Sequence, residues 1–274
     1  MKVLIIGNNS FIGSSIKSYL SKKYKVFSKS YTKAMSLNKR ILNSFDWVIN
    51  CTSNKKYIKN KYNEKFDFDL LIAKKLQNTN VRQIFLSTRK VYTPRENIKE
   101  SSRLNPKCNY SKNKAITEKK LLDILENRLL ILRISNLIGL NSKQPKRKLH
   151  KTFIDIFFEY IKKDIIFKND NLYKDFLPMK TFNIIISKLM IKRKFGIFNI
   201  SIGRKVYLNQ IINWLNFYNQ KKKQMKYKTM KKNNVDCFYL NNKKLLNLIK
   251  INNTLSDLEN ECKTISKKYF CKNG

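Results

Sequence analysis

The sequence is poor in the residue types that build metal sites and disulfide frameworks. It has a single histidine and five cysteines, none of them in a Cys-x-x-Cys pair. Zinc sites and disulfide frameworks need paired or regularly spaced ligands, so we expect neither. No stretch approaches the roughly 18 apolar residues of a membrane-spanning helix, and residues 3–6 are too short for the core of a signal peptide. The sequence therefore predicts a soluble protein of the reducing cytoplasm, without a membrane span.

Acidic residues are also scarce. There are 18 Asp and Glu against 59 Lys and Arg, which gives a formal net charge of +41. A field of this size attracts nucleic acid, anionic membranes and acidic metabolites. However, the lysines are spread along the whole chain, and Asn, Ile, Phe and Tyr are abundant too, as in proteins from AT-rich genomes. A compositionally biased, solvated surface and a dedicated polyanion site both fit this charge, and the first is favoured.

Short apolar runs alternate with helical patterns in the first half of the chain. Residues 3–6 are branched and aliphatic and are followed by Gly7, as expected of a buried parallel strand. Further strands are predicted at 24–28, 45–53, 80–88 and 128–135, and helices at 11–20, 68–77 and 112–126. Strands that alternate with helices predict right-handed crossovers and an α/β, Rossmann-like, doubly wound parallel sheet.

The pattern changes after Gly139. Residues 141–151 are polar and contain Pro145, which predicts a loop. Helices follow at 152–163, about 180–192 and about 208–218, with a strand at 196–201, and the basic stretch 219–234 is expected to be an exposed connection. We therefore predict a dinucleotide-binding domain over 1–140. Residues 141–274 would form mainly a small α/β substrate-binding lobe, with some segments returning to the first sheet.

Three groups of residues suggest chemistry on this fold. Gly7 and Gly13 bracket the turn between the first strand and helix, where small residues let a backbone approach a pyrophosphate at a helix N-terminus. Tyr110 and Lys114 are four residues apart, hence on one helical face, and a nearby ammonium lowers a phenol pKa for proton transfer. Thr88 ends a predicted parallel strand, where ligands bind in open α/β sheets. Each motif alone has an ordinary structural explanation, but their order along the chain is informative.

Together these motifs resemble the extended short-chain dehydrogenases/reductases, specifically the NAD-dependent epimerase/dehydratase family, most of whose members act on nucleotide sugars. The family's glycine-rich loop is matched by GNNSFIG at 7–13, its Ser/Thr before Val-Tyr by Thr88, and its YxxxK by Tyr110 and Lys114. Its R-x-x-N-x-x-G strand end is matched by residues 133–139. KDFLP at 174–178 and GIFNIS at 196–201 are weaker similarities. The resemblance spans nearly the whole chain.

The resemblance implies a role for each matched residue. Tyr110 would be the general acid/base, Lys114 would lower its pKa and hold the nicotinamide ribose, and Thr88 would hydrogen-bond the reacting sugar oxygen. Asn136 and Lys174 would face the substrate's sugar and diphosphate. The resemblance also implies a homodimer formed through two long helices. The cofactor would contact Gly7, Ser10, Phe11, Ile12, Gly13, Cys51, Thr52, Ser53, Tyr110 and Lys114.

Departures from the family pattern refine these expectations. Ser10 replaces the middle glycine of the loop. Thr88 is followed by Arg89 and Lys90, where 4,6-dehydratases of the family have Asp-Glu, so elimination is disfavoured and epimerisation or carbonyl reduction remains. Ser28 and Lys29 end the second strand without the carboxylate that an NAD site usually has there. They could instead accept a 2′-phosphate, which slightly favours NADP over NAD.

Two functions of different kinds follow from these observations. The favoured one is an NAD(P)-dependent nucleotide-sugar epimerase or ketoreductase. The alternative is a protein that keeps the fold but binds RNA or DNA with its positive surface, with little or no catalysis. The retained Thr88, Tyr110 and Lys114 favour the enzyme.

Overall fold

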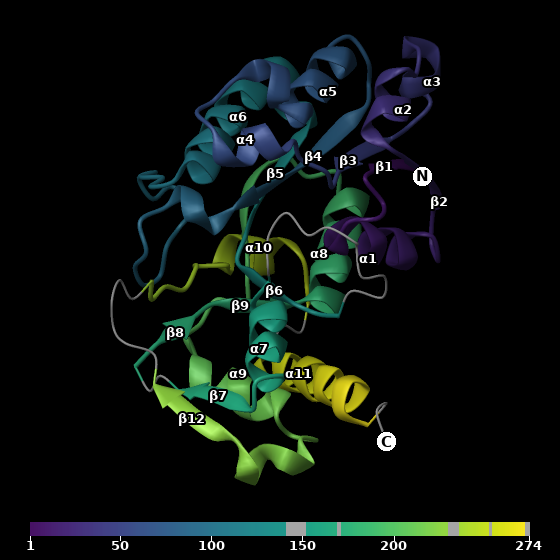
Figure 1. Cartoon of the computed structure of the whole chain (residues 1–274). Coiled ribbons are helices and arrows are strands. Elements are labelled where there is room, and N and C mark those ends of the chain that lie inside the picture. The colour runs from purple at the N-terminus through teal and green to yellow at the C-terminus, as the bar shows by residue number, and fades with distance from the viewer. Residues whose placement is uncertain (141–151, 169–170, 230–235, 252–253, 272–274) are drawn as a thin grey trace.

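A six-stranded parallel sheet forms the centre of the molecule. The computed structural model describes residues 1–140, 152–168, 171–229, 236–251 and 254–271 (Figure 1). The strand order is β10-β5-β4-β3-β1-β2, and each neighbouring pair is parallel. The strands are β1 (Lys2–Ile6), β2 (Lys25–Lys29), β3 (Trp47–Asn50), β4 (Arg82–Thr88), β5 (Leu129–Ile134) and β10 (Gly196–Ile200). The predicted doubly wound α/β fold is thereby confirmed.

Helices cover both faces of this sheet because its strands are apolar on both sides. In β1, Val3 and Ile5 belong to one core cluster, and Leu4 and Ile6 belong to the other. The first cluster is covered by α1 (Phe11–Leu20) and α8 (Met179–Ile191). The second is covered by α2 (Tyr31–Met35), α3 (Lys39–Asn43), α5 (Phe68–Leu76) and α6 (Asn109–Leu125), as Figure 1 shows. Alternating side chains on a pleated strand explain this division.

The chain reverses its direction of travel across the sheet at β1. It passes from β1 to β2 on one side and then returns to form β3 on the other side. The loops that follow β1 and β3 therefore lie side by side at the carboxyl edge of the sheet. In open α/β sheets this reversal is the place where ligands bind.

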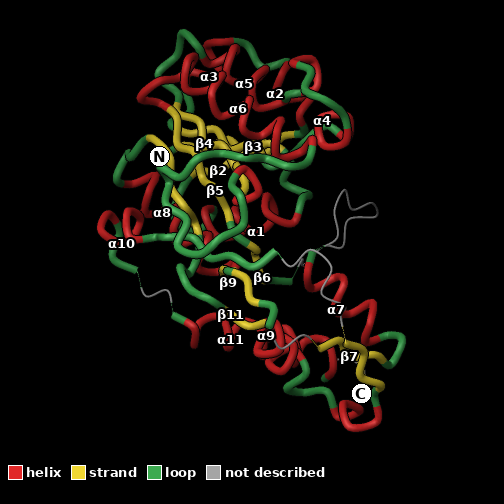
Figure 2. The backbone as a smooth tube through the Cα atoms, turned by 90° about the vertical axis from the view of Figure 1, so that its left-hand side faces the viewer, coloured by secondary structure: helices red, strands yellow, loops and turns green. Residues whose placement is uncertain are grey.

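The second lobe extends away from the sheet and shares a core with it (Figure 2). Its helices α7 (Phe153–Ile161), α9 (Leu208–Leu215) and α11 (Leu255–Phe270) bury side chains in the same cluster as α1 and α8. Three two-stranded ribbons complete it: β6 (Asn136–Ile138) with β9 (Phe176–Pro178), β7 (Ile165–Lys168) with β12 (Lys226–Thr229), and β8 (Tyr173–Lys174) with β11 (Val206–Tyr207). The short helix α10 (Lys243–Leu248) contacts β10.

Several elements differ from the sequence-based expectations. The expected connection at 219–234 contains the 3₁₀ helix η4 (Gln220–Gln224) and strand β12, which pairs in parallel with β7. All four residues of β12 are exposed, so their polar pattern resembles that of a loop and hides the strand. Helices α2, α3 and α4 (Lys55–Lys59) have only five residues each, too few to show a helical period. The predicted loop at 141–151 lies outside the described residues. Within the described residues, no helix is long and apolar enough to cross a membrane.

Candidate active site

The turn between β1 and α1 is tightly closed around its two glycines. Gly7 has φ +83°, and a Cβ added to it would lie 2.8 Å from the Thr52 Cβ. A Cβ on Gly13 would lie 2.4 Å from the Gly7 carbonyl oxygen and 3.0 Å from the Cys51 Cβ. Side chains are therefore excluded at both positions, for conformational and steric reasons at Gly7 and for steric reasons at Gly13.

Ser10 is the N-cap of α1 and completes this turn. Its hydroxyl accepts a hydrogen bond from the Gly13 amide at 3.0 Å and donates one to the Gly7 carbonyl at 3.0 Å. The first turn of a helix leaves its amides without partners inside the helix. With the Gly13 amide satisfied by Ser10, the amides of Phe11 and Ile12 are the ones in this turn suited to an anion. The serine that replaces the family's glycine thus fits the turn.

The ends of β2 and β3 flank this turn. The Gly7 amide donates to the Lys29 carbonyl at 3.0 Å, and Ser28 and Lys29 are half-buried. On the other side the Cys51 amide donates to the Ile6 carbonyl at 2.8 Å, and Cys51, Thr52 and Ser53 are half-buried. The structure therefore brings together all the residues predicted to form the cradle and the adenosine side of the cofactor site.

Tyr110 and Lys114 lie in the N-terminal half of α6. Tyr110 is half-buried, whereas the Lys114 side chain is only 5% exposed. The Lys114 ammonium lies 4.3 Å from the centre of the Phe85 ring in β4 and 5.8 Å from that of the Tyr57 ring. Tyr57 also lies in the electrostatic field of Tyr110, and burial raises the Tyr57 pKa. The face of α6 that carries the predicted pair thus points inward, toward β4 and α4.

A buried carboxylate accompanies Lys114. The Asp69 Oδ2 lies 3.8 Å from the Lys114 Nζ, and the Asp69 side chain is 7% exposed. Burial raises the pKa of Asp69 to about 6, against the lowering effect of Lys114. Burial likewise raises the pKa of the Cys51 thiol, which Asp69 raises further and Lys114 lowers. Asn50, at the end of β3, hydrogen-bonds the Asp69 carboxylate and donates to the Thr52 carbonyl at 3.1 Å, and Thr52 packs against Gly7. The turn between β1 and α1 and Lys114 are therefore linked through the end of β3.

Thr88 ends β4 and is held close to α6. Its hydroxyl accepts a hydrogen bond from the Lys90 amide at 3.3 Å, at the start of the 3₁₀ helix η2 (Arg89–Val91), which contacts α6. A buried ion pair fixes the two elements further: Arg133 of β5 binds Glu118 of α6, with Nη2 2.6 Å from Oε2. Glu118 also accepts a hydrogen bond from Ser87, the neighbour of Thr88. This network ties β4, β5 and α6 together beneath the predicted reacting groups.

The second lobe contributes Lys174 and Asn136. Asn136 Nδ2 donates to the Asp175 carbonyl at 3.0 Å, so part of this side chain holds the lobe together. Lys174 Nζ lies 3.6 Å from Asp236 Oδ2, and Arg89 forms a two-point ion pair with the same carboxylate. Arg89 directly follows Thr88. Through Asp236, Lys174 therefore lies near Arg89, the neighbour of Thr88, although Lys174 and Thr88 are far apart in sequence.

Sequence reasoning missed Asp69, Asp236 and Tyr57. Asp236 did carry a signal, since it is the only acidic residue between Asp175 and Asp257. Asp69 and Tyr57 carried no such signal: Asp69 is one of several polar residues of an amphipathic helix, and Tyr57 lies in a helix of only five residues. Asp175 matches the family's Arg-Asp segment, and its buried carboxylate accepts backbone amides from residues 202, 203 and 240.

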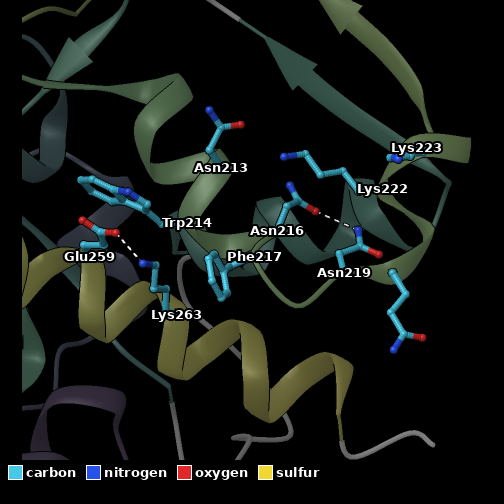
Figure 3. Close-up of a pocket in the computed structure, with 10 residues that line it drawn as sticks. Asn213, Trp214, Asn216, Phe217, Asn219, Lys222, Lys223, Glu259 and Lys263 are labelled. Atoms are coloured by element: carbon cyan, nitrogen blue, oxygen red, sulfur yellow. Dashed lines mark hydrogen bonds and ion pairs between the residues drawn. The ribbon is translucent and has the colours of Figure 1, made fainter.

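A separate open pocket of about 580 Å³ lies in the second lobe, between α9, η4 and α11 (Figure 3). None of the predicted site residues lines it. Its Lys263 is paired with Glu259 at 2.6 Å, and its Asn219 donates to Asn216 at 2.8 Å. These four polar side chains are thus paired with one another. No group of three or more His, Cys, Asp or Glu among the described residues could hold a metal ion.

Comparison with known proteins supports the fold. No family model and no curated protein sequence matches the chain. Among solved structures, a UDP-N-acetylglucosamine 4-epimerase from Methanobrevibacter ruminantium, in complex with UDP-N-acetylmuramic acid, is 18% identical with a TM-score of 0.80. The comparison covers 100% of this chain and 99% of that one. A UDP-glucose 4-epimerase from Thermotoga maritima is 20% identical with a TM-score of 0.79, over 100% of this chain and 99% of that one.

Other similar structures have different activities. A dTDP-4-dehydrorhamnose reductase from Clostridium acetobutylicum is 15% identical with a TM-score of 0.75, covering 98% of this chain and 99% of that one. At such identities the likeness establishes the fold. The chain has the fold of the extended short-chain dehydrogenases/reductases along its whole length, as the motifs predicted.

Proposed function

We propose that this protein is an NAD(P)-dependent enzyme that oxidises and reduces the sugar of a nucleotide sugar, as an epimerase or a ketoreductase. One observation carries the proposal. The inward face of α6, with Tyr110 and the buried Lys114, is linked to the turn at Gly7 and Gly13 through the end of β3. Lys114 lies 3.8 Å from Asp69, and Asn50 hydrogen-bonds Asp69 just before the residues that pack against this turn. The epimerases and the reductase named above share this fold, which supports the same class of reaction.

The turn fits a dinucleotide cofactor. Gly7 and Gly13 leave no room for a Cβ, so the backbone itself can approach a pyrophosphate, and the Phe11 and Ile12 amides at the start of α1 would bind it. Residues 51–53 would lie along the adenosine half. Lys29 carries the only charge that the carboxyl end of β2 offers to a ribose phosphate, and Ser30 caps α2 beside it. We therefore propose NADP ahead of NAD.

The residues of this chain would handle the proton and orient the sugar. A bound nicotinamide would supply the hydride acceptor or donor. When a sugar hydroxyl is oxidised, Tyr110 would take the proton of the oxygen as the carbon loses hydride, and reduction would reverse both transfers. The positive charge of Lys114 would stabilise the phenolate. Thr88 would hydrogen-bond the sugar oxygen.

The substrate side favours redox chemistry over elimination. Arg89 occupies the position where dehydratases have a carboxyl group, and its charge is taken up by Asp236. The same Asp236 holds Lys174, which would supply a point charge to the substrate's diphosphate rather than a bidentate contact. Arg89 and Lys90 replace the two carboxyl residues of the dehydratases and cannot remove water from a sugar as an acid-base carboxyl pair does.

The homodimer is a proposal with a simple test. The outer face of α6 carries Ile116, which is 37% exposed, between Lys112 and Lys119. Light scattering at two salt concentrations would measure the mass. If dimerisation opposes charge repulsion across this face, the dimer fraction should increase with salt.

The experiment that tests the function is a binding and turnover assay with one matched variant. NADPH or NADH should raise the melting temperature of the wild-type protein, because a ligand of the native state stabilises it by mass action. Tyr110→Phe should keep that stabilisation and lose about a hundredfold to ten-thousandfold in kcat on a panel of UDP-, GDP- and dTDP-linked sugars and their 4-keto forms, since proton transfer contributes roughly 10²–10⁴-fold.

Two outcomes would refute the proposal. One is the absence of stabilisation by either cofactor. The other is equal turnover by the wild-type and Tyr110→Phe proteins. If RNA or DNA binds instead, with an affinity that falls steeply with salt, the +41 charge would indicate the polyanion-binding alternative.

A further inference from the structure

The side chain of Lys114 is almost fully buried, which is unfavourable for an ammonium group without a partner of opposite charge. It is 5% exposed and lies over the rings of Phe85 and Tyr57. An ammonium that loses its hydration favours the neutral form unless an opposite charge compensates it. The role proposed for Lys114 requires the charged form, so the source of this compensation matters for the function.

The groups that face Lys114 can be assigned element by element. α5 supplies Asp69, at 3.8 Å, and Asp67, two residues earlier. α4 supplies the Tyr57 phenol, the end of β3 supplies the Cys51 thiol, and β4 supplies the uncharged Phe85. α6 itself carries Tyr110.

Asp69 is suited to act on Lys114 because its carboxylate has few other partners: Asn50 at the end of β3 hydrogen-bonds it, and the Lys114 ammonium lies 3.8 Å away. Asp67 is already engaged: it caps α5, and its Oδ2 accepts hydrogen bonds from Thr117 at 2.5 Å and Tyr62 at 3.0 Å. The Asp69 Oδ2 faces Lys114, while the buried Oδ1 has no hydrogen-bond partner. Protein structures seldom leave a buried carboxylate oxygen unsatisfied unless the charge itself is used.

We propose that Asp69 is the positioning residue of Lys114: its carboxylate compensates the buried ammonium and holds it, charged, beside the phosphate-binding turn and Tyr110. This inference rests on the function proposed above. Asp69 itself would touch neither cofactor nor substrate. Its position on α5, 45 residues before Lys114, also makes the packing of α5 against α6 a condition for a competent site.

The pair can be tested on the protein without cofactor. In Asp69→Asn, the unfolded chain still binds the lysine proton below about pH 10.4, but the folded chain binds it less readily. The melting temperature of this variant should therefore fall as the pH is lowered from about 10 to 7, by on the order of 10 °C relative to wild type. Asp67→Asn is the matched control: it removes the same charge from the same helix and should show no such slope.

A double variant distinguishes the loss of the Asp69–Lys114 ion pair from a nonspecific destabilisation by the substitution. Asp69→Asn/Lys114→Met removes the charges of both members of the pair, so it should lack the slope and melt above Asp69→Asn at pH 7. The inference is overturned if Asp69→Asn and Asp67→Asn have the same pH dependence. It is also overturned if the double variant is no more stable than Asp69→Asn.

Cofactor binding tests the positioning role itself. The stabilisation of Asp69→Asn by NADPH or NADH should decrease between pH 7 and 9, while that of wild type should not. Unchanged stabilisation in the variant would refute positioning even if the stability slope is present. Failure of the proposed function has a different signature, because the cofactor would then fail to stabilise the wild-type protein.

Discussion

Substituting Gly13 by alanine should remove the cofactor site while leaving most of the fold intact. The added Cβ would lie 2.4 Å from the Gly7 carbonyl oxygen, and ordinary contacts of this kind begin at 3.4 Å, so the carbonyl must move by about 1 Å. That carbonyl accepts hydrogen bonds from the amide and the hydroxyl of Ser10. The turn, which would aim the Phe11 and Ile12 amides at a phosphate, must therefore rearrange.

The size of both effects follows from this displacement. Overpacking costs about 1–3 kcal/mol, or roughly 3–10 °C of melting temperature for a chain of this size. Hydrogen bonds to a charged group contribute about 1.5–3 kcal/mol each, so losing two of them weakens cofactor binding at least about a hundredfold. At a cofactor concentration of 100 times the wild-type Kd, stabilisation should drop from about 2.7 to about 0.4 kcal/mol.

The assay is a thermal-shift titration with NADPH and NADH. Gly196→Ala is the control: Gly196 has φ +91°, so alanine there is strained, but its Cβ meets nothing within 4 Å and lies far from the turn in sequence. It should cost about 1–2 kcal/mol of stability and leave the cofactor-induced shift unchanged. A Gly13→Ala protein with the wild-type cofactor shift would refute the argument that this turn binds the pyrophosphate.

Three further predictions concern stability and specificity. Glu118→Gln breaks a buried ion pair with Arg133, so urea unfolding should show a free energy of unfolding lower by about 3–5 kcal/mol. Lys74→Ala breaks a half-exposed pair and should lower it by under about 1 kcal/mol. Equal losses would contradict a stabilising role of the buried pair. Burial raises the pKa of Asp175 to about 7, above its unfolded value of about 3.9, so its contribution to stability is present at low pH and is lost as the pH rises from about 4 to 7. Asp175→Asn should flatten that part of the urea-unfolding profile, and an unchanged slope would exclude Asp175 as its source. Lys29→Glu should lower the affinity for NADPH about tenfold or more and that for NADH little, and parallel losses for both cofactors would argue against a 2′-phosphate contact.

The sheet and the turn between β1 and α1 could be predicted from the sequence because both depend on local residue patterns. Residues 3–6 are apolar at every position, which suits a strand that buries both faces, and the structure divides them between two core clusters. Gly7 and Gly13 could be recognised because a turn that leaves no room for a Cβ requires glycine, and both glycines lie within seven residues of sequence. The order of Thr88, Tyr110 and Lys114 along the chain predicts that they share the carboxyl edge of the sheet.

The electrostatic partners of these residues depended on the tertiary structure. Asp69 meets Lys114 only because α5 packs on α6, and Asp236 meets Arg89 across 147 positions of sequence. In a chain with 59 basic residues, no pattern along the sequence indicates which lysine loses its hydration on folding. Burial decides that, and burial is a property of packed elements. The sequence by itself thus determined the sheet and the closed turn at Gly7 and Gly13, and the folded structure determined which charges lie beside Lys114, because an ion pair depends on distance and dielectric rather than on order along the chain.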